Sequence, residues 1–214
     1  MEEYQLKMKA LGDKLIRLIF KFLGISDEEM VKLLSYIDPT TGKPHMLLRL
    51  NSYPPCPDPS KVIGLADHTD TSFLTMLHQA RKYGLQIFKE KEGWIPLARR
   101  SDTLIINIGD LLQIISNGRF HSIPHRVMIQ ETEETTMSMA FFYYPPSYLN
   151  VAPYCKPLSE TPQTPIYKGV NVKEYFAIKA NNLGKGIAAI TIWCFILKPS
   201  CLLHFQKGFQ KISC

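Results

Sequence analysis

The 214-residue sequence predicts a mainly β protein flanked by helices, in which the strands form an antiparallel sandwich or jelly roll. Seven or eight short apolar or β-branched stretches, separated by turn-forming residues, follow one another between residues 46 and 144. A helical periodicity precedes these stretches, and a second helical pattern follows them over residues 171–185. The length is sufficient for one substantial core, and a hydrophobic content of 45% is ordinary for a globular protein.

The first element is expected to be an amphipathic helix, because apolar residues recur at alternating spacings of four and three. These residues are Tyr4, Met8, Leu11, Leu15, Leu18 and Phe22. We interpret the stripe as a face that packs on the core rather than on a membrane, since the polar face is mixed in charge. Gly24 is a plausible helix stop. Ser26 and Glu29 form the capping-box pattern that begins a second short helix, reaching to about residue 36.

From residue 45 onward the pattern changes to strands and turns. Residues 46–50 are predicted to form a strand, and the proline-rich segment 53–59 an extended loop, because proline lacks a backbone donor. Asp110 is expected to cap a short helix through residue 115, which the turn at 116–118 ends. The run 103–108 is apolar and β-branched enough to predict a buried strand. Further strands are expected over residues 73–77, 85–88, 94–97, 127–130 and 137–144.

The most informative residues are His68 and Asp70, in the sequence His-Thr-Asp, together with His125, which follows 55 residues later. If His68 and Asp70 lie on one short strand, their side chains point to the same face, because side chains alternate along a strand. Two imidazoles and one carboxylate are the ligand set of a non-haem Fe(II) centre. Such a centre leaves positions open for a chelating co-substrate and O₂. A three-residue pattern is common by chance, so the flanking sequence must support the assignment.

Two other histidines are candidates for the same site. His121 lies four residues before His125, but the intervening Pro124 argues against the continuous helix that such a pair would need. We therefore interpret His78 and His121 as structural.

The segments around these residues resemble the plant 2-oxoglutarate- and Fe(II)-dependent dioxygenases. The resemblance is strongest over residues 45–150 and rests on several motifs in order. Within this family the motifs are most similar to those of gibberellin oxidases of the 3-oxidase type, although flavonoid and alkaloid oxygenases share nearly all of them. The motifs are LNSYPPCPDP (50–59), GLADHTD (64–70), GLQIF (84–88), GW (93–94), NIGD (107–110), SNG (116–118) and HRV (125–127).

This resemblance implies a double-stranded β-helix, a form of jelly roll, with a metal held between its two sheets. It implies that His68, Asp70 and His125 bind Fe(II), that Tyr53 and Ser138 bind 2-oxoglutarate, and that no further catalytic residue is needed. O₂ would be the second co-substrate and ascorbate the reductant. The implied activity is hydroxylation or desaturation of a small hydrophobic plant metabolite, for which we expect a gibberellin. A flavonoid or another specialised metabolite is the alternative.

The sequence departs from the family pattern at Thr136. The family normally has an arginine two residues before the serine that corresponds to Ser138, and its planar fork binds a carboxylate through two charge-assisted hydrogen bonds. Losing such a partner costs about 2–5 kcal/mol, which corresponds to about 30- to 4000-fold in affinity for the co-substrate. No Lys or Arg between residues 127 and 155 replaces it, and Arg126 should point away from the metal. An impaired or inactive relative that binds only the metal is therefore the alternative function.

The chain is expected to divide into four parts. Residues 1–44 form a helical segment, a remnant of the family's longer N-terminal region, and residues 45–150 form the oxygenase core. Residues 151–192 form a strand and helix extension, and residues 193–214 an atypical tail. The tail holds three of the five cysteines, three lysines and no acidic residue, so we hypothesise that it is not native to the domain.

Composition limits the partners that we expect. The net charge of +6 is scattered without a basic run, which predicts no nucleic-acid partner. There is no signal-peptide pattern, and the apolar run at 187–197 is about half a membrane span, so we expect a cytoplasmic protein without a membrane anchor. The five cysteines show no paired framework, which favours a reduced, intracellular chain. We expect a monomer whose partners are a small-molecule substrate and O₂.

Overall fold

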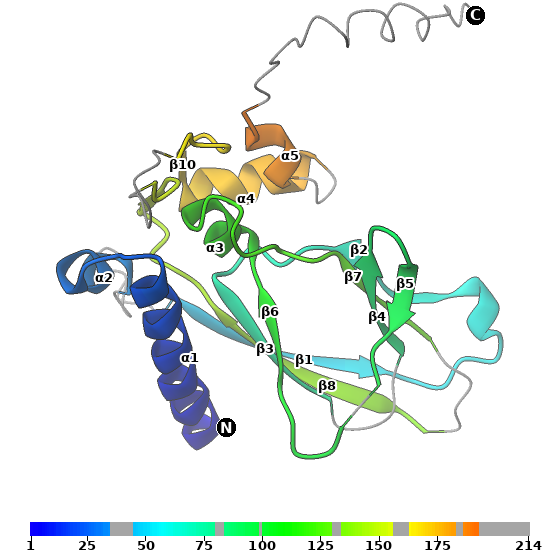
Figure 1. The fold of residues 1–214 in the computed structure, drawn as a ribbon. Coiled ribbons are helices and arrows are strands. Elements are labelled where there is room, and N and C mark those ends of the chain that lie inside the picture. The colour runs from blue at the N-terminus through cyan, green and yellow to red at the C-terminus, as the bar shows by residue number, and fades with distance from the viewer. Residues whose placement is uncertain are drawn as a thin grey trace, which may run out of the picture.

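The computed structural model describes residues 1–34, 45–79, 84–98, 100–129, 134–155, 163–182 and 186–192. In this part of the chain, two four-stranded antiparallel sheets lie beside a group of helices (Figure 1). The first sheet has the order β1–β8–β3–β6, formed by Met46–Tyr53, Thr136–Tyr143, Leu74–Gln79 and Ile105–Ile108. The second sheet has the order β2–β7–β4–β5, formed by Ile63–His68, His125–Met128, Gly84–Lys89 and Gly93–Pro96.

The chain alternates between the two sheets. Strands β1 and β3 belong to the first sheet and β2 and β4 to the second. After the β4–β5 hairpin the chain returns to the first sheet with β6, crosses to the second with β7, and ends in the first with β8. This connectivity is that of a double-stranded β-helix, so the predicted jelly roll is confirmed.

Strand β6 corrects one expectation. The run 103–108 is predicted to form a buried strand, but β6 lies at the edge of the first sheet, and in the described part of the chain it pairs with β3 alone. The Ile106 side chain, in its centre, is 38% exposed. An apolar, β-branched composition predicts a strand correctly, but it does not reveal whether a neighbour covers that strand.

Helix α1 (Glu2–Phe22) packs on the outer face of β3 and β8. Its buried face agrees with the predicted stripe in the first part of the helix, where Tyr4, Met8, Leu11 and Leu15 contact the core cluster. The stripe is wrong at Leu18 and Phe22, which are more than half exposed. Gly12 sets the rotation of the helix, because a Cβ atom there would lie only 2.4 Å from Cδ2 of Tyr143. The residues of α1 that this close approach buries are Met8, Gly12, Ile16 and Phe20.

The boundary between the first two helices is as predicted. Gly24 follows α1 with φ of +77°, a left-handed conformation that glycine adopts without strain. The Ser26 hydroxyl accepts a hydrogen bond from the Glu29 amide, and the Glu29 carboxylate accepts one from the Ser26 amide. This capping box begins α2 (Asp27–Leu33); residues 35 and 36, where we expected its end, lie outside the described residues.

Helix α3 (Asp110–Ile115) corrects the expectation that Asp110 is its capping residue. The cap is Gly109, and the Asp110 side chain makes no capping hydrogen bond. A Cβ atom on Gly109 would lie 1.9 Å from the Ser72 carbonyl oxygen, so this position must be glycine. The predicted turn after the helix is confirmed, with positive φ at Asn117 and Gly118.

The C-terminal extension packs beside α3. It consists of β9 (Asn150–Val151), β10 (Val170–Asn171), α4 (Val172–Asn181) and α5 (Gly186–Ile190). The predicted helix over 171–185 corresponds to α4; residues 183–185 and the atypical tail 193–214 lie outside the described residues. A short 3₁₀ turn, η1 (Pro59–Lys61), interrupts the proline-rich loop. Among the described residues, no helix has the length and apolar character to cross a membrane.

Two apolar clusters hold these elements together. The larger cluster joins α1, α3 and α4 to the first sheet and includes the edge-to-face pair Phe20 and Phe73, with ring centroids 5.7 Å apart. The smaller cluster lies between the sheets and contains Leu77, Leu85, Val127 and Ala140. It forms the apolar floor of the space in which the predicted ligands meet.

Candidate metal centre

The predicted ligands meet where the second sheet turns toward the first. His68 is the last residue of β2 and His125 the first of β7, and the two are directly paired across these strands. The two ligands were expected to share one strand, but β2 ends at His68, so Asp70 lies outside it. Asp70 lies in the loop that follows, and its side chain still turns toward both imidazoles.

The three side chains converge closely enough to hold one metal ion. One ligand atom from each of His68, Asp70 and His125 lies within 4.8 Å of the other two. The Oδ1 atom of Asp70 is 3.7 Å from the Nε2 atoms of both histidines. Two imidazole nitrogens and one carboxylate oxygen suit an iron site with open coordination positions. No other such cluster of His, Cys, Asp and Glu occurs among the described residues.

The backbone orients both imidazoles. The Nδ1 atom of His68 lies 2.8 Å from the Ala66 carbonyl oxygen, and that of His125 lies 3.1 Å from the Ile123 carbonyl oxygen. With Nδ1–H donating to these carbonyls, both Nε2 atoms are left as acceptors that face Asp70. Burial, and then the neighbouring His125, lower the pKa of His68, so this imidazole is neutral near pH 7 and able to bind a metal.

Asp70 is fixed by a partner that the sequence analysis missed. Asn107 of β6 donates a hydrogen bond from Nδ2 to Oδ2 of Asp70 at 3.3 Å. The other carboxylate oxygen is thereby left for the histidines. Asn107 belongs to the NIGD motif, which signalled its importance, but the motif alone does not tell which residue it contacts.

The pocket around the ligands is lined from both sheets, and β1 contributes three of its polar side chains. Arg49, Asn51 and Tyr53 alternate along β1 and all line this pocket. Tyr53 therefore lines the same pocket as the ligands, and its role toward 2-oxoglutarate stays a prediction. Ser138 is fully buried beside it on β8, where its hydroxyl accepts a hydrogen bond from Nδ2 of Asn51 at 3.2 Å.

Arg49 is the residue that sequence reasoning should have found. It is the one Lys or Arg among the described residues that line this pocket, and its guanidinium lies 5.8 Å from the ring centroid of Phe142. Its spacing of two and four residues from Asn51 and Tyr53 was a sufficient signal. Arg49 lies on β1, the strand next to that of Thr136, where it pairs with Ala140 rather than with position 136.

The remaining candidates lie away from the ligands. His78 follows Leu77 on β3. Because Thr75 and Leu77 line the pocket, alternation turns His78 to the opposite face of the sheet. His121 is exposed in the segment before β7. Arg126 points away from the pocket as expected: it donates to Gln86 and stacks on Trp94, with its guanidinium carbon 4.2 Å from the ring centroid.

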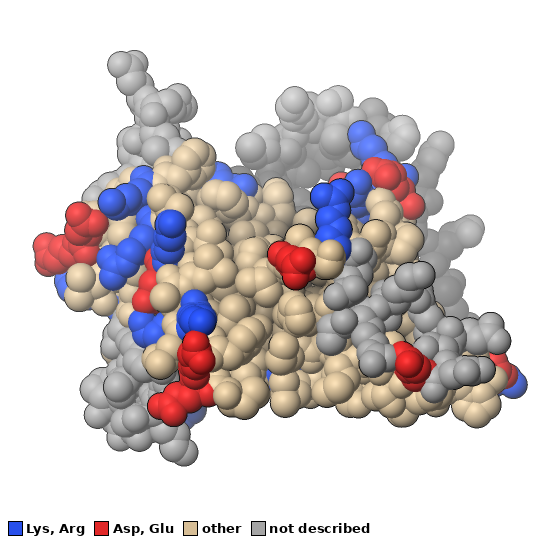
Figure 2. All heavy atoms as spheres, turned by 90° about the horizontal axis from the view of Figure 1, so that it is seen from below, with Lys and Arg blue, Asp and Glu red and all other residues tan. Residues whose placement is uncertain are grey.

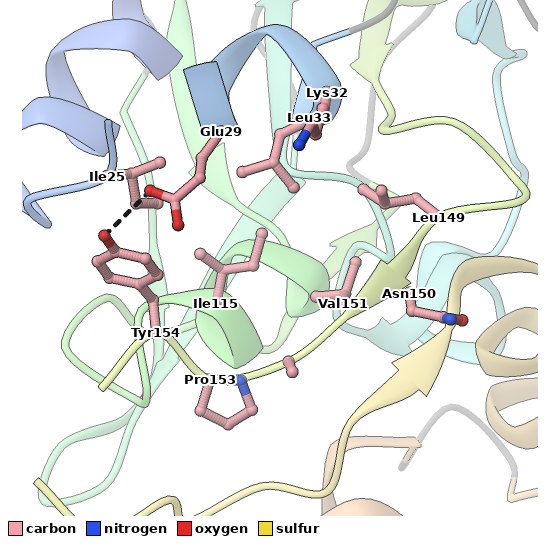
Figure 3. Close-up of a pocket in the computed structure, with 11 residues that line it drawn as sticks. Ile25, Glu29, Lys32, Leu33, Ile115, Leu149, Asn150, Val151, Pro153 and Tyr154 are labelled. Atoms are coloured by element: carbon pink, nitrogen blue, oxygen red, sulfur yellow. Dashed lines mark hydrogen bonds between the residues drawn. The ribbon is translucent and has the colours of Figure 1, made fainter. Parts of the chain in front are cut away.

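A second cavity of about 330 Å³ lies elsewhere, between α2, α3 and β9 (Figure 3). Its walls are mainly apolar, with Ile25, Leu33, Ile115 and Val151 pointing into it. Its described polar side chains include Glu29, whose carboxylate contacts the Tyr154 hydroxyl at 3.2 Å. None of the three converging ligands lines this cavity, so we place the chemistry at the other pocket.

The charge distribution on one face of the molecule concerns the question of a nucleic-acid partner. Figure 2 shows Lys and Arg interspersed with Asp and Glu on this face, separated by broad uncharged areas. No continuous basic stripe of the kind that tracks a nucleic-acid backbone is visible there. Among the described cysteines, Cys56 and Cys155 are free thiols.

A double-stranded β-helix in which two histidines and one aspartate converge between the sheets defines the class of non-haem iron oxygenases. The sequence comparison agrees: the profile of the 2OG-Fe(II) oxygenase superfamily matches residues 44–145. The chain therefore carries a domain of the 2OG-Fe(II) oxygenase superfamily.

Its curated relatives include gibberellin oxidases. The chain is 36% identical over 189 residues to gibberellin 3-beta-dioxygenase 1 of Arabidopsis thaliana, an alignment that covers 88% of this chain and 52% of the relative. It is 37% identical over 190 residues to gibberellin 3-beta-dioxygenase 1 of Pisum sativum, covering 89% and 50%. The chain thus spans about half the length of the curated relatives that it matches.

Solved structures show the same fold. The crystal structure of JOX2 in complex with 2OG, Fe and JA superposes with a TM-score of 0.68 at 28% identity, covering 82% of this chain and 50% of that one. The rice dioxygenase for auxin oxidation superposes with a TM-score of 0.71 at 23% identity, covering 89% and 62%. This second likeness concerns the fold alone.

Proposed function

We propose that this chain is the oxygenase domain of an Fe(II)- and 2-oxoglutarate-dependent enzyme that hydroxylates or desaturates a small hydrophobic plant metabolite, in first place a gibberellin. His68, Asp70 and His125 would bind the iron. The observation that carries the proposal is the convergence of these three ligand atoms within 4.8 Å, inside a fold of this superfamily. A flavonoid or another specialised metabolite is the alternative substrate class.

Bound iron would supply the oxidative chemistry, using O₂ and a 2-oxo acid. The chain's own residues would hold and shield the reactants. The carbonyl oxygens of residues 66 and 123 orient the histidines, and Asn107 orients Asp70. The apolar cluster between the sheets, which includes Leu77 and Leu85, would keep water from the reacting atoms.

The 2-oxoglutarate side of the pocket is proposed to lie near Tyr53 and Ser138. Thr136 pairs with Tyr53 across β1 and β8, and its hydroxyl lies 3.5 Å from the Tyr53 carbonyl oxygen. Threonine offers no charge to the far carboxylate of the co-substrate, so we expect weak binding of 2-oxoglutarate. Arg49 lies four residues from Tyr53, roughly 13 Å along the strand, and is therefore placed for a different anionic group.

The acid group of a gibberellin-like substrate fits Arg49 by charge. The Arg49 side chain is exposed, so a ligand entering the pocket can reach it. A carboxylate bound by a guanidinium through charge-assisted hydrogen bonds would orient the apolar body of the substrate toward the ligands.

We further propose that the protein acts as a cytoplasmic monomer with ascorbate as the reductant.

The test is turnover of 2-oxoglutarate by the purified chain with isotopically labelled gibberellins. We expect succinate release that depends on the substrate, and a Thr136→Arg variant that releases succinate at least 30-fold faster when 2-oxoglutarate is below saturation. The matched control is Asp70→Ala, which should release none. Equal rates in the wild-type protein and the Thr136→Arg variant would refute the role assigned to position 136.

The second candidate function is an impaired relative that binds the metal but does not turn over 2-oxoglutarate. Thr136 is the observation that favours it. Fe(II) binding without succinate release from the wild-type chain, and with release restored by Thr136→Arg, would support this second function.

A further inference from the structure

We propose that Lys179 of α4 and Asp110 of α3 form a positioning pair that holds the loop between the first two metal ligands in its binding geometry before the metal arrives. The proposal rests on the proposed metal centre. It assigns a role to the C-terminal extension, whose described residues contribute no ligand to the centre.

The Asp110 carboxylate is the centre of a buried network. Its side chain is completely buried, and its Oδ2 atom lies 2.6 Å from Nζ of Lys179. The same oxygen accepts hydrogen bonds from the Tyr175 hydroxyl at 2.9 Å and from the Thr69 hydroxyl at 3.1 Å. Burial raises the pKa of Tyr175, so its hydroxyl keeps the proton that it donates. Two of these partners come from α4, and Thr69 comes from the metal loop.

Lys179 contacts the metal loop directly. Its ammonium group donates to the Thr69 backbone carbonyl at 2.7 Å and contacts the Thr69 hydroxyl at 3.0 Å. Thr69 is the residue between His68 and Asp70, so a contact with its backbone constrains both ligands. The ammonium group is largely withdrawn from water, with only 12% of the Lys179 side chain exposed.

The backbone of Asp110 also contacts the loop that carries the Asp70 ligand. Its amide donates to the Asp70 carbonyl oxygen at 2.7 Å, while its carboxylate binds Thr69 through the hydroxyl. Residues 69 and 70 are therefore held by the side chain and the main chain of one residue, and Lys179 neutralises the buried charge that this arrangement requires. The Asp110 carboxylate is bound to Thr69, Tyr175 and Lys179, and it therefore does not cap α3.

A pair of this kind acts on the metal through its ligands. Partners outside the ligand shell typically change metal affinity by about 10- to 100-fold when they are removed. Lys179→Met keeps the approximate length and the apolar stem of the side chain and removes the ammonium group, with its charge and its hydrogen bonds to Thr69 and Asp110. It leaves the Asp110 carboxylate buried without its cation, and we expect the loop to loosen and the metal to bind more weakly.

The experiment compares Lys179→Met with Lys173→Met, a matched change at an exposed position of the same helix. Co(II), a spectroscopic substitute for Fe(II), is titrated anaerobically into each protein, and the exchange of the amide hydrogens of residues 69–71 is measured in the metal-free state. We expect Lys179→Met to weaken Co(II) binding by about 10- to 100-fold and to speed loop exchange. Lys173→Met should bind Co(II) with the affinity of the wild type. The charge-conserving Lys179→Arg should lose less Co(II) affinity than Lys179→Met.

A purely structural role would lower the thermal midpoint of Lys179→Met but leave the Co(II) affinity and the loop exchange of the folded protein unchanged. That result would overturn the proposal. Should Lys179→Met not fold, Thr69→Val removes only the hydroxyl that links the network to the loop, and unchanged Co(II) affinity there would overturn it equally. If the wild-type chain bound no Co(II), the proposed metal centre would fail, while loop exchange in the variants would still decide whether the pair positions the loop.

Discussion

At the scale of single residues, the site separates metal binding from anion binding. His68, Asp70 and His125 converge and are each oriented by a hydrogen bond, through Ala66, Asn107 and Ile123. The positive charge in the pocket, by contrast, is on β1 at Arg49 rather than on β8 at position 136. The domain therefore differs from the family pattern in how it would hold carboxylates and not in how it would hold a metal.

Arg49→Met should weaken binding of an acidic substrate. Loss of a hydrogen bond to a charged group costs about 1.5–3 kcal/mol, or about 10- to 150-fold in affinity. We expect the KM for a gibberellin acid to rise by this factor and kcat to change far less. Initial rates of succinate release measure both. Arg126→Met, which removes an arginine outside the pocket, is the control. If the methyl ester of the same gibberellin lost as much affinity as the acid, Arg49 would not be the carboxylate partner.

At the scale of elements, the close packing of α1 on the first sheet depends on Gly12. A Cβ atom at this position would meet Tyr143, whose ring is buried and whose hydroxyl donates to Asp13, so the ring cannot easily move away. The turn of α1 that carries Asp13 thus fixes Tyr143 both by contact and by a hydrogen bond.

Gly12→Ala should therefore destabilise the protein although alanine favours the helix. The helical preference contributes about 1 kcal/mol of stabilisation, and overpacking costs about 1–3 kcal/mol; we expect a net loss of about 1 kcal/mol in the free energy of urea unfolding. Ala10→Gly, at an exposed position of the same helix, measures the preference alone. A Gly12→Ala protein more stable than the wild type would show that the helix can shift away from Tyr143.

The elements also show what sequence can and cannot predict. Apolar and β-branched runs predicted most strands, and local signals at Gly24 and Ser26 predicted the end of α1 and the start of α2. Strand β2 carries no such run and forms through its pairing with β7. The predicted burial of β6 was wrong, and the predicted apolar face of α1 was wrong at Leu18 and Phe22, because both depend on which neighbour packs there.

The site follows the same division. The spacing of His68 and Asp70 is local, and the motifs around His125 are specific, so the ligands could be named in advance. Asn107 could be identified as part of a motif but not as a partner of Asp70. Lys179 could not be predicted, since it comes within 2.7 Å of Thr69 only through the packing of α4 on α3.

At the scale of the whole molecule, two four-stranded antiparallel sheets both line the pocket of the metal ligands. Helix α4 is connected to this centre through the buried ion pair of Lys179 and Asp110. This chain matches about half of the length of its curated relatives, and that half contains the three converging ligands and both four-stranded sheets. We therefore propose that this chain would bind Fe(II) through His68, Asp70 and His125 and would take up 2-oxoglutarate at the same centre.

The most direct test is the visible absorption band that forms when Fe(II) and 2-oxoglutarate combine without O₂ in such a site. We predict that the wild-type chain gives this band at millimolar 2-oxoglutarate. The Thr136→Arg variant should give it at a concentration at least 30-fold lower, and His125→Ala should not give it. Absence of the band from both the wild type and Thr136→Arg, with Fe(II) and 2-oxoglutarate in excess, would contradict the claim.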